Sequence, residues 1–540
     1  MFWYVFTQLY SWIGAPCTGS RYFHDAVQVS ATTRSLRRDN EKDTFSATAA
    51  LANHPSCTWS NLDQRCHPSH HINTIFSSAD DIEYQSACPL EPAYPAESPD
   101  FLGDWMSALM KISTFSSTPL SALSIPGTHD SLSYDLSLTL AHDAVDDHDR
   151  LSKILRELSI LRRPNEVEEF IRLQAQSQKL DIVQQLDNGI RFIDFRITYE
   201  SKETGQSKAD WYSLHSVLST CPAAVYLKEV RDWMEEHPQE VVVVWFSRHG
   251  SVSDRGESAY PNTPISAKLQ FWRIVEEIFD GVLIDTSVSD YRTTEIKELV
   301  ARNHRLVPFV SDYEEFTDSS VHGYDSKCIN NEDKGGIFHE VETYEEQREY
   351  FFSRHNVDED KWFDLLGMNT AAEEWQIESA LKLRFLPFHI FDSCSSAVNI
   401  PGNQMCPTSL LDIAQLQNYY NQRVLAEAYE SYASGAVDEI HFPNAFYLDG
   451  LDVDGSVRTG TMTLEGRSRP GALKEYNQTR YAAVDTIIAY NVEKVCKSSL
   501  KMSDQASCQN LQTYLEGRIS RYPAQRWQEP ALGRRDDWPM

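Results

Sequence analysis

Short apolar runs alternate with longer segments of helical periodicity from about residue 101 onward. The apolar runs are LSALSIP, GIRFIDFRI, WYSLHS, EVVVVWFS, HRLVPFVSDY, LRFLPFHIFDS and HFPNAFYLDG. Helix-like segments between them include DRLSKILRELSILRR, AVYLKEVRDWMEEHP, AKLQFWRIVEEIFDG and NQRVLAEAYESYASG. About seven such strand–helix units predict an α/β protein, an irregular (β/α)8 TIM-type barrel with insertions. A doubly wound open sheet is the alternative, but neither GxGxxG nor GxxxxGK[ST] occurs in the chain.

Segments of different composition flank or interrupt the predicted barrel, which we expect within residues 101–500. Residues 16–100 are rich in Ser, Asp, His, Thr and Pro without sustained periodicity, which predicts a loop-rich extension. The polar and acidic stretch at about 325–380 is expected to be an insertion that carries helices. Residues 501–540, rich in Arg, Asp, Trp and Pro, are expected to form a weakly structured tail.

The N-terminus and the cysteines both favour a secreted protein. Residues 1–15 resemble a secretory signal peptide, since a mostly apolar run leads into small residues, although no Lys or Arg precedes it. An aromatic segment that packs or anchors is the alternative. The chain has 10 cysteines and no CxxC pair, which in a secreted protein predicts several disulfides. Three pairs are close enough in the sequence to be local: Cys57–Cys66, Cys394–Cys406 and Cys496–Cys508.

The formal net charge of −30 limits the classes of partner. Such a charge disfavours nucleic acid and repels anionic membrane surfaces from the chain as a whole. A local basic site could still bind a phosphate group. We expect a monomer.

Polar residues follow one apolar run after another, at the point where each strand would end. Because the carboxyl ends of barrel strands meet at one mouth, these side chains are expected to share a pocket. A single histidine after a strand is more often a turn residue, so the prediction depends on the recurrence. The residues are, in chain order, His129, Asp130, Asp194, Arg196, His215, Arg248, His249, Asp312, Asp392 and Asp449.

This set of side chains suits a displacement at phosphorus. Two imidazoles can act as base and acid. A guanidinium between them can neutralise the non-bridging phosphate oxygens. A carboxylate behind each histidine fixes its tautomer and raises its basicity. No metal or other cofactor is required.

Three blocks of sequence resemble the X domain of phosphatidylinositol-specific phospholipase C. They are SIPGTHDS, the block QKLDIVQQLDNGIRFIDFRI at residues 178–197, and the following LHS. The resemblance spans roughly residues 101–460. It is closer to the bacterial type and its single-domain eukaryotic relatives than to the large signalling enzymes. It implies a barrel that cleaves an inositol phospholipid at a membrane surface into diacylglycerol and a cyclic inositol phosphate.

The resemblance also implies roles for individual residues. His129 matches the general base that takes the proton of the inositol 2-hydroxyl. His215 matches the general acid that protonates the departing diacylglycerol oxygen. Arg196 matches the phosphate-binding arginine of the bacterial type, and Arg248 stands near a basic substrate-contacting residue of the fourth strand.

Three carboxylates complete the implied site. Asp130 and Asp194 match active-site acids, and Asp449 matches the late aspartate that orients the first histidine. The calcium-dependent signalling type has Asn in place of Asp130, a second acid in place of Arg196 and Glu near Arg248. Calcium needs a cluster of hard oxygen ligands, and here a guanidinium supplies the positive charge instead. We therefore predict activity without a metal.

Two further segments contain metal-binding residue types without a metal-binding pattern. The spacing in CHPSHH, from Cys66 to His71, matches no standard zinc site. In DGLDVDG, a 12-residue EF-hand loop would begin at Gly450 and place Thr461 where the bidentate Glu belongs. Neither segment is predicted to bind a metal.

Two other functions remain open from the sequence. Related two-histidine barrels cleave sphingomyelin or lysophospholipids, usually with magnesium held by several acids, and the Arg196 pattern argues against that. A non-catalytic barrel could instead bind inositol phosphates or a protein partner through its insertions.

Overall fold

The computed structural model describes most of the region after residue 100. The described residues are 101–141, 164–200, 210–215, 217–247, 263–311, 313, 322–331, 344–353, 361–368, 398–400, 403–405, 409–437, 440, 442–450, 459–464, 467–473, 482–499 and 502–519. All of them belong to one of two compact units of the chain, the unit made of Met1–Gly19 and Pro92–Met540.

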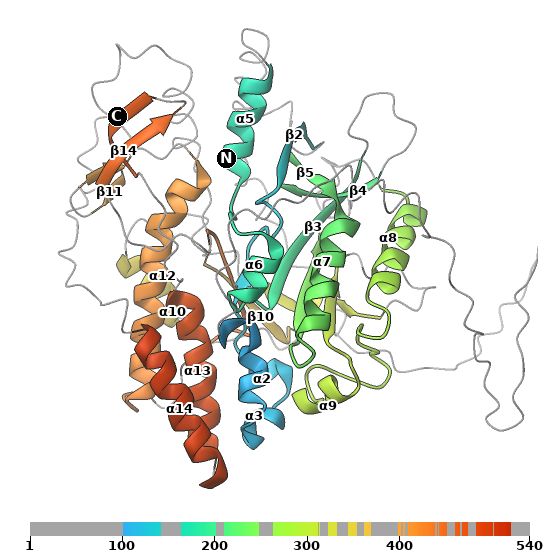
Figure 1. The fold of residues 1–540 in the computed structure, drawn as a ribbon, viewed down its shortest axis with the longest axis vertical. Helices are drawn as coiled ribbons and strands as arrows, with labels where there is room; N and C mark the ends of the chain where they lie inside the picture. Colours follow the sequence, from blue (N-terminus) through green and yellow to red (C-terminus); the bar gives the residue numbers. More distant parts are fainter. Residues whose placement is uncertain are drawn as a thin grey trace, which may run out of the picture. The chain divides into compact units, whose positions relative to one another are not determined.

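Eight parallel strands, counted among the described residues, form the central sheet (Figure 1). In sheet order they are β8 (Tyr324–Asp325), β7 (Leu306–Val310), β6 (Val242–Ser247), β3 (Phe192–Glu200), β1 (Gly127–Thr128), β13 (Ala445–Leu448), β10 (Phe363–Met368) and β9 (Ile329–Asn331). The two outer strands, β8 and β9, are consecutive in the chain and are joined by the 3-10 turn Ser326–Cys328. No ladder pairs them within the described part of the chain, so the predicted barrel is confirmed as an α/β fold with an open seam.

An antiparallel extension projects from β3. The second half of β3 pairs with β4 (Asp210–His215), and β5 (Val217–Pro222) and β2 (Leu136–Leu140) follow. The prediction that WYSLHS forms a strand of the barrel is wrong, because β4 runs antiparallel to β3. Since β3 is longer than its neighbours, β4 returns along its free end and finishes at His215.

Helices accompany the strands and match three of the predicted helical segments. Helix α7 buries Tyr226, Leu227 and Val230 along one face, as the spacing of its apolar residues predicts. Figure 1 shows α6, α7 and α8 beside one another, and α10, α12, α13 and α14 as a second group. The helices are α2 (Trp105–Leu109), α3 (Ser113–Ser116), α5 (Pro164–Ala175), α6 (Ile182–Asp187), α7 (Ala223–Glu236), α8 (Ile265–Ile278), α9 (Ile296–Ala301), α10 (Tyr344–Ser353), α12 (Leu410–Ala433), α13 (Ala482–Ser498) and α14 (Met502–Ile519). None of these helices is long and apolar enough to cross a bilayer.

Two segment assignments need correction. The stretch at 325–380 is more than an insertion, because it contains β9 and β10 as well as helix α10. The predicted tail at 501–540 begins with an 18-residue helix, α14. This helix packs against α13 and is linked to it by the predicted disulfide Cys496–Cys508, which compensates for its mixed polar sequence.

Strand β1 is short, and its glycine determines how closely it can approach its neighbours. A Cβ atom on Gly127 would lie 2.5 Å from the carbonyl oxygen of Phe446 and 2.7 Å from Cβ of Phe192. Only a glycine therefore fits between β3 and β13 without displacing them. This close packing places the next residues, His129 and Asp130, at the carboxyl end of the sheet.

Several predictions concern residues outside the described ranges. They are the signal peptide at 1–15, the extension at 16–100, the segments CHPSHH, DRLSKILRELSILRR and LRFLPFHIFDS, the pairs Cys57–Cys66 and Cys394–Cys406, and the residues Arg248, His249, Asp312 and Asp392. Two small hairpins are also described, β11 (Val398–Ile400) with β12 (Asn403–Met405) and β14 (Thr459–Leu464) with β15 (Arg467–Leu473).

Candidate active site

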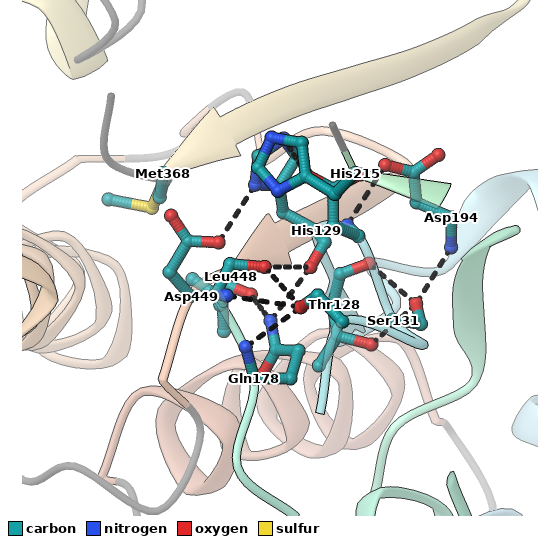
Figure 2. A network of polar contacts seen from close by, with 12 residues as sticks. Thr128, His129, Ser131, Gln178, Asp194, His215, Met368, Leu448 and Asp449 are labelled. Carbon is teal, nitrogen blue, oxygen red and sulfur yellow. Dashed lines mark hydrogen bonds and ion pairs between the residues drawn. The ribbon is translucent and has the colours of Figure 1, made fainter. Parts of the chain in front are cut away.

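The structure brings six predicted site residues together at the carboxyl ends of the strands. Figure 2 labels His129, Asp194, His215 and Asp449 among them. One pair follows β1, another lies within β3, one residue ends β4 and one follows β13. The residues are His129, Asp130, Asp194, Arg196, His215 and Asp449. The His129 side chain is 2% exposed, whereas the His215 side chain is 15% exposed, so His215 is the more accessible of the two histidines.

His129 contacts one carboxylate at each ring nitrogen. Its Nδ1 lies 2.8 Å from Oδ1 of Asp449, and its Nε2 lies 3.3 Å from Oδ2 of Asp130. The ring also stacks on Tyr447, with centroids 5.3 Å apart. Because Asp449 accepts a hydrogen bond from Nδ1, the neutral ring has its lone pair on Nε2.

Asp130 connects both histidines to the arginine. Its Oδ1 lies 2.5 Å from Nε of Arg196, and its Oδ2 lies 3.2 Å from Nδ1 of His215. The backbone of Asp130 has φ of 45°, a left-handed conformation that aspartate tolerates better than most residues. Its backbone N–H donates to Oδ2 of Asp194 at 3.0 Å, which holds this turn against β3.

Arg196 and His215 complete the arrangement. Arg196 Nη2 lies 2.9 Å from Oδ2 of Asp194, so its guanidinium contacts two carboxylates. His215 Nδ1 lies 2.5 Å from the carbonyl oxygen of Ala175. Since a carbonyl can only accept, Nδ1 carries a proton and Nε2 is the nitrogen that can exchange one. The rings of His129 and His215 are 6.1 Å apart between centroids.

The surroundings move the pKa values of the two histidines in opposite directions. Burial lowers the pKa of His129, but Asp130 and Asp449 outweigh burial and raise it. Burial also lowers the pKa of His215, and Asp130 does not compensate because Arg196 and His129 add positive charge nearby. Burial opposes the charge of Arg196, yet Asp130 and Asp194 raise its pKa further, so its guanidinium stays charged.

The site contains a group of side chains that could be considered for a metal. Ligand atoms of His129, Asp130 and Asp194 lie within 4.8 Å of one another, among the residues that the structure describes. Arg196 forms ion pairs with both carboxylates, so a cation there would face the charge of the guanidinium. The set also offers fewer hard oxygens than calcium takes. These residues do not fit a calcium ion, and metal independence remains a prediction.

The family comparison matches the part of the chain that carries three of the six site residues. The family model described as PI-PLC X 1 matches residues 170–270, which include Asp194, Arg196 and His215. This part of the chain is similar to the PI-PLC X domain family. Three site residues lie outside the matched range: His129, Asp130 and Asp449. The fold brings them next to the matched residues.

Curated relatives carry the same domain name. The human PI-PLC X domain-containing protein 1 is 33% identical over 144 residues, which are 26% of this chain and 40% of that protein. The human PI-PLC X domain-containing protein 2 is 29% identical over 148 residues, 27% of this chain and 43% of that protein. The chain thus spans about two fifths of the length of these relatives.

Solved structures of bacterial enzymes show a more distant likeness. The phosphatidylinositol-specific phospholipase C from Listeria monocytogenes has 16% identity and a TM-score of 0.39, covering 72% of this chain and 98% of the enzyme. A mutant of the Staphylococcus aureus enzyme has 12% identity and a TM-score of 0.38, covering 73% of this chain and 98% of that chain. Both TM-scores lie below 0.5, so no function is inferred from this likeness.

The site also includes residues that could not be identified from the sequence. Tyr447 stacks on His129, and its position two residues before Asp449 is the only signal that could have indicated it. Asn418 of α12 donates to the carbonyl oxygen of Asp449 at 3.0 Å, and no local pattern marks it. Gln178 donates to the carbonyl oxygen of His129. It is the first residue of the block at 178–197 that resembles the family, but nothing in that block indicates this contact.

Proposed function

We propose that this protein is a phosphoric diester hydrolase or phosphorus–oxygen lyase of the phospholipase C type, acting on an inositol phospholipid through two-histidine acid–base catalysis. The observation that carries the proposal is the placement of His129 and His215 on the same ion pair, Asp130–Arg196. A base, an acid and a phosphate-binding cation are the groups that an in-line displacement at phosphorus needs.

The reaction assigns one step to each group. Arg196 binds the non-bridging phosphate oxygens. Nε2 of His129 takes the proton of the inositol 2-hydroxyl, while Asp449 holds Nδ1 and stabilises the imidazolium that forms. The 2-oxygen forms a bond to phosphorus as the bond to the diacylglycerol oxygen breaks. Nε2 of His215 gives its proton to that leaving oxygen, which yields diacylglycerol and a cyclic inositol phosphate.

The protonation states that this mechanism needs differ from those favoured without substrate. The base must be neutral and the acid protonated, whereas the pKa of His129 is raised and that of His215 is lowered. A phosphodiester anion bound between Arg196 and His215 would raise the pKa of His215, because an opposite charge favours the imidazolium. In this proposal, substrate binding therefore favours the protonated form of His215 that can act as the acid.

A change of leaving group tests which histidine is the acid. An analogue with sulfur in place of the diacylglycerol oxygen releases a thiolate, which needs little protonation. We predict that His215→Ala loses on the order of 10²–10⁴-fold in kcat with the oxygen ester and far less with the sulfur analogue. His129→Ala is expected to lose a similar factor with both substrates. Selective rescue of His129→Ala would show that the two roles are reversed.

A lipid panel tests the substrate class and the metal prediction together. Vesicles of phosphatidylinositol, sphingomyelin or a lysophospholipid are incubated with the protein in EDTA, and again with calcium or magnesium. We predict cleavage of phosphatidylinositol in EDTA. Sphingomyelin cleavage that requires magnesium would replace the proposal with a sphingomyelinase-like activity, and inositol phosphate binding without turnover would indicate a non-catalytic barrel.

We also propose that the protein works in an oxidising compartment, as a secreted protein does. The disulfide Cys496–Cys508 supports this, and Cys328 is disulfide-bonded as well. Cytosolic thiols are mostly kept reduced. Expression of the full chain in cells of a secretory host should place it in the medium without residues 1–15, and exclusive recovery from the cytosol would refute the proposal.

A further inference from the structure

The last residue of α5 and the short segment after it contact both histidines. The carbonyl oxygen of Ala175 contacts Nδ1 of His215 at 2.5 Å. Two residues on, Oγ of Ser177 donates to the carbonyl oxygen of His129 at 3.1 Å. Gln178 then donates to the same oxygen through Nε2 at 2.8 Å. Residues 175–178 therefore connect the predicted acid to the predicted base.

Gln178 also binds the strand that carries the partner of the base. Its Nε2 donates to the carbonyl oxygen of Leu448 at 2.7 Å, directly before Asp449 in the chain. Figure 2 shows the Gln178 amide directed at these two carbonyls. One planar amide thus holds the end of β1 and the end of β13, which present His129 and Asp449 to each other.

The amide is itself held in place. The backbone N–H of Gln178 donates to Oγ of Ser133 at 3.0 Å, and Oγ of Ser133 hydrogen-bonds Oγ of Ser177 at 2.7 Å. The backbone N–H of Gly450 donates to the carbonyl oxygen of Ser177 at 2.7 Å. Gln178 is fully buried, so it does not touch substrate in this arrangement.

We propose that Gln178 is a positioning residue that sets the hydrogen bond between His129 and Asp449, and this inference rests on the proposed function. The bond between these side chains spans the ends of β1 and β13, and β1 is only two residues long. One backbone hydrogen bond joins the two ends, from the N–H of His129 to the carbonyl oxygen of Leu448 at 3.0 Å, and Gln178 adds two more. A clamp of two hydrogen bonds on adjacent carbonyls limits movement of either end. Misplacement of a catalytic group by about 1 Å can cost on the order of 10²-fold in rate.

The test compares Gln178→Leu with a matched control that binds the segment leading into β1. Asn491 is also fully buried and binds the backbone of Ser124, accepting from its N–H at 2.9 Å and donating to its carbonyl at 2.6 Å. Asn491→Leu removes a comparable pair of hydrogen bonds far from the catalytic groups. Both variants are expected to lower Tm, as any buried hydrogen-bond loss does.

Only the Gln178 variant should change the behaviour of the base. For Gln178→Leu we expect kcat on phosphatidylinositol vesicles to fall about 10- to 100-fold with little change in KM. The pKa of His129, followed by NMR of its ring protons, should fall as the contact with Asp449 loosens. Asn491→Leu should retain both values. An unchanged kcat and His129 pKa in Gln178→Leu, or equal changes in both variants, would overturn the inference.

A second variant and a readout that does not depend on activity complete the experiment. If Gln178→Leu does not fold, Gln178→Met replaces it, because methionine has a similar length and a flexible stem but no donor. If the wild-type protein cleaves no lipid, the proposed function fails, while the NMR titration still reports whether Gln178 sets the His129–Asp449 pair.

Discussion

His129 has a carboxylate at each ring nitrogen, and the two have different tasks. Asp449 accepts from Nδ1 and is fully buried, so it orients the ring. Asp130 lies near Nε2 but also pairs with Arg196, so its charge is shared between a histidine and the guanidinium. A phosphate bound by Arg196 would compete with Asp130 for that cation. The base is thus held by one acid and modulated by the other.

The substitution Asp449→Asn tests the first of these tasks. Asp449 raises the pKa of His129, so the amide should lower that pKa, and kcat should fall on the order of 10²-fold or more because the ring loses its orienting charge. NMR titration of His129 together with steady-state kinetics measures both effects. Because Asp130 also raises this pKa, only an unchanged His129 pKa in the variant would contradict this account of the pair.

The same pair predicts a pH dependence of stability. Because the folded-state pKa of His129 lies above the unfolded value of about 6.5, the pair stabilises the fold fully below that value. This contribution is lost as pH rises through the folded-state pKa. Urea unfolding across this window should show a decline in the free energy of unfolding that Asp449→Asn reduces. Identical pH profiles for both proteins would be inconsistent with the linkage.

At the residue scale, the side chains that converge in the structure can be predicted from the sequence better than the residues that support them. His129, Arg196 and His215 have distinctive chemistry and follow or end apolar runs, so their types and positions predict that they lie together. The supports act through backbone carbonyls, as Gln178 does on His129 and Leu448. Such contacts depend on how separate strands meet, which residue type alone does not reveal.

At the scale of elements, the close fit of β1 determines where the base lies. We predict that Gly127→Ala destabilises the fold by about 2 kcal/mol, because its Cβ would clash with backbone and side-chain atoms of β13 and β3. Gly103→Ala is the matched control, since its nearest contacts would be at 3.6 Å, ordinary van der Waals distance. Chemical denaturation measures both. Equal stabilities of the two variants would show that β1 can shift to accept a side chain.

Strands and helices could be predicted where an apolar run was long. They could not be predicted where tertiary contacts determine the secondary structure. EVVVVWFS forms β6, with buried residues on both faces, as a central parallel strand does. Strands β8 and β9 have two and three residues, too few to show a period. Helix α14 has no apolar face strong enough to predict it, and packing on α13 with the disulfide Cys496–Cys508 stabilises it.

At the scale of the whole molecule, the site unites distant parts of the chain. His129 and Asp449 are separated by 320 positions, yet β1 and β13 are neighbours in the sheet. The match to the X domain at residues 170–270 contains only part of the site. The general rule that barrel strands end at one mouth predicts the convergence. It does not predict the antiparallel extension, which places His215 at the site from outside the parallel strands.

The central claim is that two histidines cleave an inositol phospholipid without a metal. The most direct measurement is 31P NMR of phosphatidylinositol vesicles incubated in EDTA with wild-type protein, His129→Ala or His215→Ala. We predict that the wild type produces a cyclic inositol phosphate as the first product and that either variant is slower by on the order of 10²–10⁴-fold. Absence of a cyclic product with the wild type, or equal rates in all three proteins, would contradict the claim.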